Sequence, residues 1–218
     1  MNILLIGAKG KMGRCMQQYL KQHNINYVGV DIDNINEHIN SHIDVILDFS
    51  LPSAVTQNLK LAQKYNCPIV IATTGHDKDN MKIIIQYSKN IPIFLSENFS
   101  ILFFLMTRLI RNLKGIQNMD VVVEEKHHKQ KVDRPSGSAK KLIKILNFAN
   151  ISPKVYVFRV ANVVGEHSVG IFAEDEQLCI SHRAQSKMVF CKGAYLACKF
   201  IMEKKPKIYG MEDLVDSM

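Results

Sequence analysis

The residues best suited to chemistry lie close together between positions 124 and 141, which read EEKHHKQKVDRPSGSAKK. Two adjacent histidines, His127 and His128, are followed by Lys131 and by the turn-like sequence Pro-Ser-Gly-Ser at 135–138. Histidine titrates near neutral pH and can transfer protons, and a lysine ammonium is a compact positive charge. Solvated surface side chains are the alternative interpretation, and this segment alone does not decide between the two.

A second candidate site is the sequence GAKGKMG at 7–13, between an expected first strand and an expected first helix. Glycine at this spacing lets the backbone approach a pyrophosphate, which then contacts the unpaired N–H groups at the start of the helix. A plain glycine-rich turn between strand and helix is the alternative. The residues expected to bind a dinucleotide here are Gly7, Ala8, Lys9, Gly10, Lys11 and Met12.

An acidic residue at the end of the second expected strand bears on the choice of dinucleotide. Asp31 lies eighteen residues after Gly13, where a carboxylate would accept hydrogen bonds from the adenosine ribose hydroxyls of NADH. No arginine follows it to hold a 2′-phosphate, although Lys9 and Lys11 could soften the discrimination against NADPH. Asp33 is a competing candidate, and an ordinary turn is the alternative role of Asp31.

Short apolar runs alternate with amphipathic helices through the first half of the chain. Such continuous apolar strands, separated by helices, predict a parallel sheet covered on both faces, which is a doubly wound Rossmann-type α/β fold. The expected strands span 2–6, 27–31, 44–48, 68–72 and 92–95, and the expected helices span 11–23, 53–65 and 79–88.

The second half predicts a different architecture. After a helix at 101–113, strands follow one another with few helices between them, which is typical of an α+β domain built on an open mixed, mostly antiparallel sheet. A final helical pattern from 192 onward is expected to pack on the first domain. The expected strands span 121–125, 155–163, 169–173 and 177–184, and one helix spans 138–148.

Charge and cysteine content narrow the possible classes of protein. The net charge is +8, but the lysines are spread along helical faces, so nucleic-acid binding is only a minor alternative to binding small anions. The longest apolar stretch, 101–106, is too short to cross a membrane.

An odd number of cysteines without a C-x-x-C pair predicts reduced thiols and a cytoplasmic protein. We expect buried side chains for all five, Cys15, Cys67, Cys179, Cys191 and Cys198.

Eight motifs, in order along nearly the whole chain, resemble the dihydrodipicolinate reductase family. They are GAKGKMG at 7, DFSLP at 48, ATTG at 72, ENFS at 97, EEKHHKQKVDRPSGSA at 124, VVGEHSV at 163, SHRAQSK at 181 and FCKGA at 190. The stretch from 124 is the most specific, being close to the family pattern E-x-H-H-x-x-K-x-D-A-P-S-G-T-A. The resemblance implies NAD(P)H-dependent reduction of 4-hydroxy-tetrahydrodipicolinate, with loss of water, in the diaminopimelate route to lysine.

The resemblance also implies roles for the residues from 127 to 138. His127 would donate the proton, and His128 would hold one carboxylate of a small dicarboxylate substrate. Lys131 would bind a carboxylate and take part in catalysis. The helix start at Ser136, Gly137 and Ser138 would bind a carboxylate through backbone N–H groups and the Ser138 hydroxyl. Because neighbouring side chains on a strand point apart, both histidines can serve one ligand only if the backbone bends.

Loops after later strands would complete the cofactor site, since ligands collect at the carboxyl ends of strands in such sheets. Ser50 has an alternative role as a helix cap. The residues implied are Phe49, Ser50, Ala72, Thr73, Thr74, Ser96, Glu97, Asn98 and Phe99. NADH is the expected cofactor, with NADPH also accepted, and no metal, nucleic acid or membrane is expected as a partner.

The family forms tetramers, so the resemblance implies a homotetramer assembled through the second domain. Residues 1–99 and 188–218 would form the dinucleotide-binding domain, and 100–187 the substrate-binding and oligomerisation domain.

The chain departs from the family pattern at several positions. The family's usual glycine is replaced by Ala72, which requires a negative φ there. Arg134 replaces alanine, Val160 and Ala161 replace glycines, and Lys187 stands where arginine is common; the segment before Arg159 is also short.

Two other functions remain open at this point. A related two-domain dehydrogenase could act on another imine or aldehyde acid. A nucleotide-sensing or nucleic-acid-binding protein could keep the dinucleotide-binding half without catalysis, but it would not need His127, His128 and Lys131 together.

Overall fold

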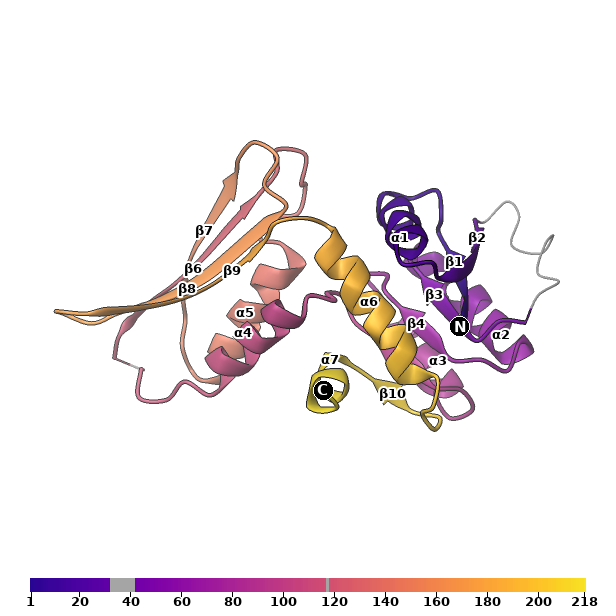
Figure 1. Cartoon of the computed structure of the whole chain (residues 1–218). Coiled ribbons are helices and arrows are strands. Elements are labelled where there is room, and N and C mark those ends of the chain that lie inside the picture. Colours follow the sequence, from indigo (N-terminus) through magenta and orange to yellow (C-terminus); the bar gives the residue numbers. More distant parts are fainter. Residues whose placement is uncertain (32–41, 117) are drawn as a thin grey trace. The chain divides into compact units, whose positions relative to one another are not determined.

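The computed structural model describes residues 1–31, 42–116 and 118–218, which form two compact units (Figure 1). Unit 1 contains residues 1–99 and 188–218, and unit 2 contains residues 100–187. Asp33, the alternative ribose-binding candidate, lies outside the described residues. None of the helices described here is long and apolar enough to cross a membrane.

Unit 1 is built on a parallel sheet with the strand order β10-β5-β4-β3-β1-β2. Its strands are almost wholly apolar because helices cover both faces, and every pairing between them is parallel. This confirms the predicted doubly wound Rossmann-type architecture. The strands are β1 (Asn2–Ile6), β2 (Asn26–Val30), β3 (Val45–Asp48), β4 (Ile69–Ile71), β5 (Ile93–Leu95) and β10 (Ile208–Tyr209).

The helices of unit 1 divide between the two faces of this sheet. Leu4, Ile46 and Ile69 pack with Leu59 and Ile84, which come from two helices on one face. Alternate strand residues are also buried and must face the opposite side, where α6 packs against α1, β3 and β4. The helices are α1 (Lys11–Gln22), the 3-10 turn η1 (Pro52–Ala54), α2 (Val55–Lys64), α3 (Lys78–Tyr87), α6 (Met188–Ile201) and α7 (Met211–Asp216).

Unit 2 contains a four-stranded sheet with the order β7-β6-β8-β9. β6 and β7 are parallel, whereas β6–β8 and β8–β9 are antiparallel, which confirms the predicted mixed, mostly antiparallel sheet. The strands are β6 (Asp120–His127), β7 (Lys154–Arg159), β8 (Gly165–Phe172) and β9 (Gln177–Ala184), and the helices are α4 (Ile101–Arg111) and α5 (Gly137–Phe148).

One face of the unit 2 sheet is covered by α4 and α5. Val123 and Val169 pack there with Phe103 and Leu142, so these strand residues define the covered face. Side chains alternate between faces along a strand, and every second residue of β6 is buried. Two polar residues of β6, Glu125 and His127, therefore project to the covered face together with the apolar residues.

Several predicted boundaries and burials require correction. β7 ends at Arg159, before 163, because a turn follows in which the Val163 N–H bonds to the Val160 carbonyl. The short strand β10 and helix α7 were not predicted. Cys67, Cys191 and Cys198 are buried as expected, but Cys15 is only half-buried and Cys179 is exposed. Cys179 pairs with Gly170 on β8 and projects to the uncovered face of the sheet.

Candidate active site

The carboxyl ends of the strands in unit 1 lie level with one another. Ile6 pairs with Asp48, which pairs with Ile71, so the loops after β1, β3 and β4 emerge at the same edge. Those loops, with the one after β5, contain most of the residues that the sequence assigned to the cofactor. Lys11 and Met12 begin α1, and Asp31 follows β2. Open α/β sheets bind ligands at this edge.

The glycine loop is shaped by close backbone contacts. Gly7 has φ of +80°, and a Cβ atom there would lie 2.7 Å from the carbonyl carbon of Phe49. A Cβ atom on Gly13 would lie 2.1 Å from the Gly7 carbonyl oxygen. Gly10 is the N-cap of α1, and no side chain caps this helix. The arrangement fits a dinucleotide, because the helix start presents backbone N–H groups without a side chain over them.

Asp31 lies beside the glycine loop. Its Oδ2 atom accepts a hydrogen bond of 2.9 Å from the backbone N–H of Lys9. The acidic residue and the loop, although separated in the sequence, are therefore joined in the fold. This is the geometry in which a carboxylate can serve a ribose while the loop serves the pyrophosphate.

A buried carboxylate organises the loop after β3. Asp48 is fully buried, and its Oδ1 atom accepts hydrogen bonds from the Ser50 N–H (2.8 Å) and the Ser50 hydroxyl (2.5 Å). Burial raises the pKa of Asp48, although the donors from Ser50 and Asn58 oppose that rise. Ser50 does not cap the following helix, whose N-cap is Leu51 without a side-chain bond. The alternative role of Ser50 is thus wrong, and Ser50 is held at the loop.

The remaining cofactor candidates differ in exposure. Ala72 has a negative φ, as its replacement of glycine requires. Thr73 is buried with its hydroxyl 2.8 Å from Nε2 of His76, whereas Thr74 is exposed. Ser96 is half-buried, its hydroxyl donating to the Asn98 carbonyl, and Glu97 is exposed.

Phe99 contributes to this edge through its backbone. Its side chain is buried and stacks on Phe94, with ring centroids 5.8 Å apart. Helix α6 comes so close that a Cβ atom on Gly193 would lie 1.8 Å from the Phe99 carbonyl oxygen. The loop after β5 is therefore fixed by core packing.

In unit 2, the backbone bends directly after His127. β6 ends at this residue, and the Lys131 N–H then donates to the His128 carbonyl in a turn. His127 is buried, whereas His128 is half-buried. The bend that both histidines need in order to serve one ligand is present.

Helix α5 starts beside this turn, with Ser136 as its N-cap. The buried Ser136 hydroxyl accepts a hydrogen bond of 3.2 Å from the Ala139 N–H. The Ser136 N–H donates to Oε2 of Glu125 at 3.0 Å. Ser136 is thus occupied in forming the helix start, whereas Gly137 is exposed and Ser138 is half-buried.

The side chain of Asp133 contacts two of the groups that the sequence assigned to substrate binding, Lys131 and Gly137. Oδ1 of Asp133 is 2.8 Å from Nζ of Lys131, and the backbone N–H of Gly137 also donates to this carboxylate. Burial would raise the pKa of Asp133, but these donors outweigh it and hold the pKa below its usual value. The carboxylate shows that both donors converge on one anionic group.

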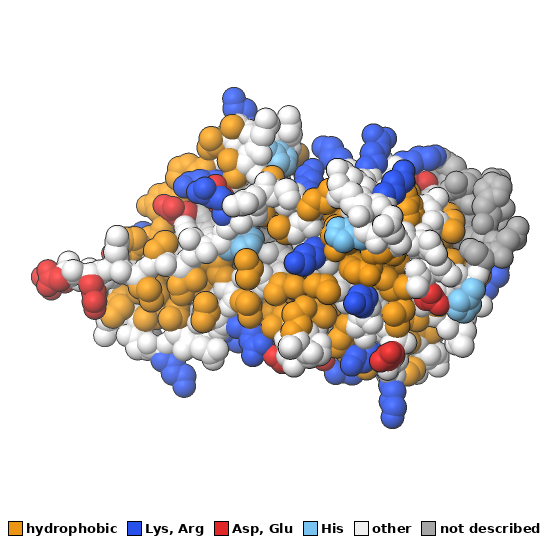
Figure 2. Space-filling view, in the orientation of Figure 1, with side chains coloured by type: hydrophobic (Ala, Val, Ile, Leu, Met, Phe, Trp, Pro, Cys, Tyr) orange, Lys and Arg blue, Asp and Glu red, His pale blue; other side chains and the backbone are white. Residues whose placement is uncertain are grey.

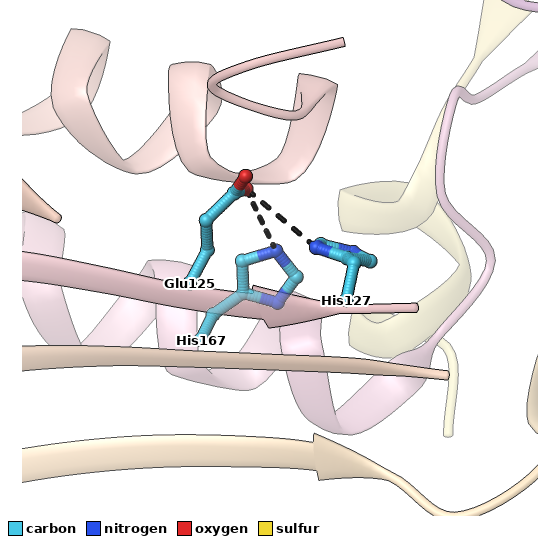
Figure 3. Close-up of side chains that lie close together, drawn as sticks. All are labelled: Glu125, His127 and His167. Atoms are coloured by element: carbon cyan, nitrogen blue, oxygen red, sulfur yellow. Dashed lines mark ion pairs between the residues drawn. The ribbon is translucent and has the colours of Figure 1, made fainter. Parts of the chain in front are cut away.

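Three polar side chains meet on the covered face of the sheet, as Figure 3 shows. Oε2 of Glu125 is 3.8 Å from Nδ1 of His127 and 3.9 Å from Nε2 of His167. Oε1 of Glu125 is 2.9 Å from Nη2 of Arg159. Sequence reasoning missed Glu125, Arg159 and His167 as site residues. The signal was available in the strands around the motifs E-x-H-H and VVGEHSV, where Glu125, His127 and His167 fall in the same alternation as apolar residues such as Val123 and Val169.

Burial controls the charge of this cluster. Removal from water lowers the pKa of His127 to about 4, with Lys131 and Arg159 adding to the effect and Glu125 and Asp133 opposing it. Burial likewise lowers the pKa of His167 to about 3. Burial would raise the pKa of Glu125, yet hydrogen bonds from Ser136 and Arg159 hold it below its usual value. At neutral pH the cluster is one carboxylate, one guanidinium and two neutral imidazoles.

The same three side chains also have the composition of a metal site. Their ligand atoms lie within 4.8 Å of one another. Both oxygens of Glu125 already accept hydrogen bonds, one from a guanidinium and one from a backbone N–H. The arrangement therefore favours a hydrogen-bonding role for Glu125 over that of a metal ligand.

On the face of the molecule drawn in Figure 2, some lysine and arginine side chains lie close together and others stand apart among hydrophobic and uncharged ones. In the turn from 127 to 138, Lys131 and the Gly137 N–H meet one carboxylate, which is an arrangement that suits a small anion.

The chain combines a unit with a Rossmann-type parallel sheet and a unit with a mixed sheet. Similar solved structures include a dipicolinate-bound dihydrodipicolinate reductase from Paenisporosarcina sp. TG-14, with a TM-score of 0.73 and 18% identity, covering 96% of this chain and 97% of that one. An amine dehydrogenase from Mycobacterium smegmatis has a TM-score of 0.60 and 7% identity, covering 97% and 95%. At these identities the likeness concerns the fold.

The chain belongs to the dihydrodipicolinate reductase family. The family model for the N-terminus matches residues 21–99, and the model for the C-terminus matches residues 100–215. A 4-hydroxy-tetrahydrodipicolinate reductase from Caldanaerobacter subterraneus is 32% identical, covering 98% of this chain and 97% of the relative. Another from Thermosipho africanus is 34% identical, covering 97% and 96%.

Proposed function

We propose that this protein reduces 4-hydroxy-tetrahydrodipicolinate to tetrahydrodipicolinate in the diaminopimelate route to lysine, using NADH or NADPH. Full-length relatives with this name support the proposal, as does the family membership. The single observation that carries it is the convergence of His127, Lys131 and the start of α5 at one turn of unit 2. That turn combines a proton donor with cations and N–H groups for a dicarboxylate.

When bound, the reduced nicotinamide supplies the hydride for the ring of the substrate. Glycines that leave room for a pyrophosphate, together with Asp31 at the ribose position, would hold the dinucleotide on unit 1. Phe49, Ser50, Ala72, Thr73 and Thr74 would form the adjoining groove. The segment from Ser96 to Phe99 would complete it.

The substrate carboxylates would be bound by residues of unit 2. Lys131 and the Gly137 N–H already bind the Asp133 carboxylate, so they can bind a ligand carboxylate in the same way. His128 and the Ser138 N–H and hydroxyl would bind around the same turn. The solved relative that holds dipicolinate, a planar ring with two carboxylates, supports a ligand of this class.

His127 would supply the proton. Hydride addition leaves an electron pair on a ring carbon or nitrogen, and that atom takes the proton from the imidazolium, while water leaves the ring. His127 is neutral at pH 7 in the structure because burial lowers its pKa to about 4. Two substrate carboxylates nearby would raise that pKa, since negative charge favours the imidazolium. Substrate binding would thereby charge the acid that it needs.

A coupled assay tests the proposed function directly. The substrate is generated enzymatically, and nicotinamide absorbance is followed with NADH and NADPH in parallel. We expect turnover with both cofactors and none when the substrate is left out. Faster turnover of another imine or aldehyde acid, with no reduction of the lysine-pathway imine, would assign the protein to a different reaction of the same fold class.

NADH is the preferred cofactor in this proposal, and Asp31→Ala tests the preference. A carboxylate binds ribose hydroxyls but repels a 2′-phosphate, so its loss should raise the dissociation constant of NADH about tenfold and should not raise that of NADPH. Fluorescence titration of each cofactor measures both constants.

The control for this variant is Asp79→Ala. Asp79 lies exposed in the first turn of α3 and contacts Lys82, and it is not among the residues assigned to the cofactor. We expect it to change neither dissociation constant by more than about twofold. An unchanged ratio of NADH to NADPH affinity in Asp31→Ala would remove Asp31 from the proposed site.

The two units would divide the work between cofactor and substrate. Residues 1–99 and 188–218 would bind the dinucleotide, and residues 100–187 would bind the substrate and form the oligomer. The face of the unit 2 sheet opposite α4 and α5 carries Tyr156, Phe158 and Phe172, all substantially exposed. We assign this face to a homotetramer contact in a cytoplasmic enzyme, and a light-scattering mass of four chains would support the assembly.

A further inference from the structure

We propose that the buried ion pair between Glu125 and Arg159 is a positioning device for this site. The pair would hold three parts in one arrangement: the start of α5, the backbone of the 131–133 segment and the ring of His127. This inference rests on the proposed function, because it concerns how the proton donor and the carboxylate-binding lysine are held.

The first step concerns the Glu125 carboxylate, both of whose oxygens accept a hydrogen bond. Its side chain is 0% exposed, and that of Arg159 is 4% exposed. One oxygen accepts from Arg159 at 2.9 Å and the other from the Ser136 N–H at 3.0 Å. Burying such a pair costs desolvation energy, and apolar replacements are often as stable. Stability alone therefore gives no reason for these two charges, whereas fixing the start of α5 does.

The second step is the reach of the guanidinium. Nε of Arg159 donates to the Lys131 carbonyl at 3.1 Å, Nη2 also donates to the Asp133 carbonyl, and Nη1 donates to the Phe158 carbonyl at 2.9 Å. Residues 128–136 form neither helix nor strand. The Arg159 side chain therefore bonds to backbone carbonyls of the segment that carries Lys131, as a neighbouring strand would do in a sheet.

The third step concerns the proton donor. Nδ1 of His127 is buried without a hydrogen-bond partner among the described residues, and it lies 3.8 Å from Glu125 Oε2. On protonation, a small movement would let Nδ1–H donate to this carboxylate, leaving Nε2–H for the substrate. Nε2 packs beside Gly165, where a Cβ atom would be only 3.2 Å away, so the ring fits against β8 because this residue has no side chain.

His167 completes the surroundings of this ring. Its ring packs edge-on against that of His127, with centroids 5.1 Å apart, and its Nε2 lies 3.3 Å from the Ser136 hydroxyl. The charged groups that act on His127 are Glu125 and Asp133, which favour the imidazolium, and Lys131 and Arg159, which disfavour it. Glu125 is the only one of the two anions that is fully buried, and its effect is therefore the least screened by solvent.

Glu125→Gln tests the inference, because glutamine keeps the shape and removes the charge. We expect kcat to fall about a hundredfold, as for a misplaced catalytic group. Loss of the negative charge disfavours the imidazolium, so the pH at which kcat declines should move to lower values. The dissociation constant of dipicolinate, measured by calorimetry, should rise about tenfold as the Lys131 segment loosens. That of NADH should stay within about twofold.

Glu124→Gln is the matched control, since Glu124 is the preceding residue of β6 and projects to the opposite face, near Ser168. It should leave kcat and the dissociation constants of dipicolinate and NADH within about twofold of wild type, and the pH at which kcat declines should not move. Arg159→Lys is a second variant, which keeps the charge but cannot reach all the acceptors. It should weaken dipicolinate binding, and it provides the test if Glu125→Gln does not fold.

The outcomes separate this inference from the proposed function. Wild-type kcat and dipicolinate affinity in folded Glu125→Gln, or a loss of kcat without a shift of its pH dependence, would overturn the positioning role. Failure of the wild-type protein to reduce the substrate would overturn the proposed function, while calorimetry with dipicolinate would still test the ion pair. If calorimetry found unchanged dipicolinate binding in both Glu125→Gln and Arg159→Lys, the positioning role of the ion pair would be refuted.

Discussion

His127→Gln is expected to lower kcat by about two to four orders of magnitude while changing the KM for the dicarboxylate only a few fold. General acid catalysis contributes an effect of this size, and it acts in the transition state more than in the bound ground state. His127 ends β6 next to Lys131 and the start of α5, where glutamine can fill the space but cannot donate a proton from an imidazolium. Steady-state kinetics with both substrates varied would measure the effect.

The pH dependence of the wild-type enzyme gives the same residue a second test. The donating form is the imidazolium, which is lost as pH rises through the pKa of His127. The ratio kcat/KM reports the free enzyme, in which burial lowers this pKa to about 4, so it should decline as pH rises above that value. The decline of kcat should begin at higher pH, because the bound carboxylates raise the pKa.

His42→Gln is the control for the histidine prediction. His42 is exposed and pairs with Asp44 in unit 1. Its replacement should leave kcat and both pH profiles within about twofold of wild type. If His127→Gln kept the alkaline decline of the wild-type enzyme at full amplitude, another group would have to be the acid.

Lys131→Met should lower kcat/KM for the dicarboxylate by about ten to a hundredfold and leave the NADH dissociation constant unchanged. A hydrogen bond to a charged group contributes about 1.5 to 3 kcal/mol, which corresponds to a loss of this order. Methionine keeps much of the side-chain volume and removes the ammonium that binds the Asp133 carboxylate at 2.8 Å. Steady-state kinetics and calorimetry with NADH would measure the two effects separately.

Lys129→Met is the matched control, because Lys129 is exposed in the same turn. It should reduce kcat/KM by no more than about twofold. An equal loss of substrate turnover and NADH affinity in Lys131→Met would contradict the division of binding between the two units.

The sequence predicted unit 1 well because its strands are buried on both faces and appear as short apolar runs. Five strands of its sheet were located within one or two residues, and the parallel order followed from the helices between them. β10 has two residues, Ile208 and Tyr209, too few to show a period of two. Its place beside β5 is a long-range pairing that local pattern does not encode.

The candidate site was predicted in part. Family motifs indicated His127, His128, Lys131 and the Ser136 turn, all of which are close in sequence. Arg159 was not assigned a role, because its contact with Glu125 joins residues 34 positions apart through the pairing of β6 and β7. His167 likewise arrives through β8. The missed residues depend on sheet register, which a single sequence specifies only weakly.

The Asp133 carboxylate on Lys131 and Gly137 has a further consequence for ligand exchange. A binding site that carries its own counter-ion is not left as bare positive charge between turnovers. Chloride, phosphate and other abundant cellular anions must then compete with a tethered group whose local concentration is high, and they gain little by binding. The ring dicarboxylate, with two negative ends and several partners, is better able to displace it. The site would thus select the dicarboxylate over other anions at the binding step, before hydride transfer.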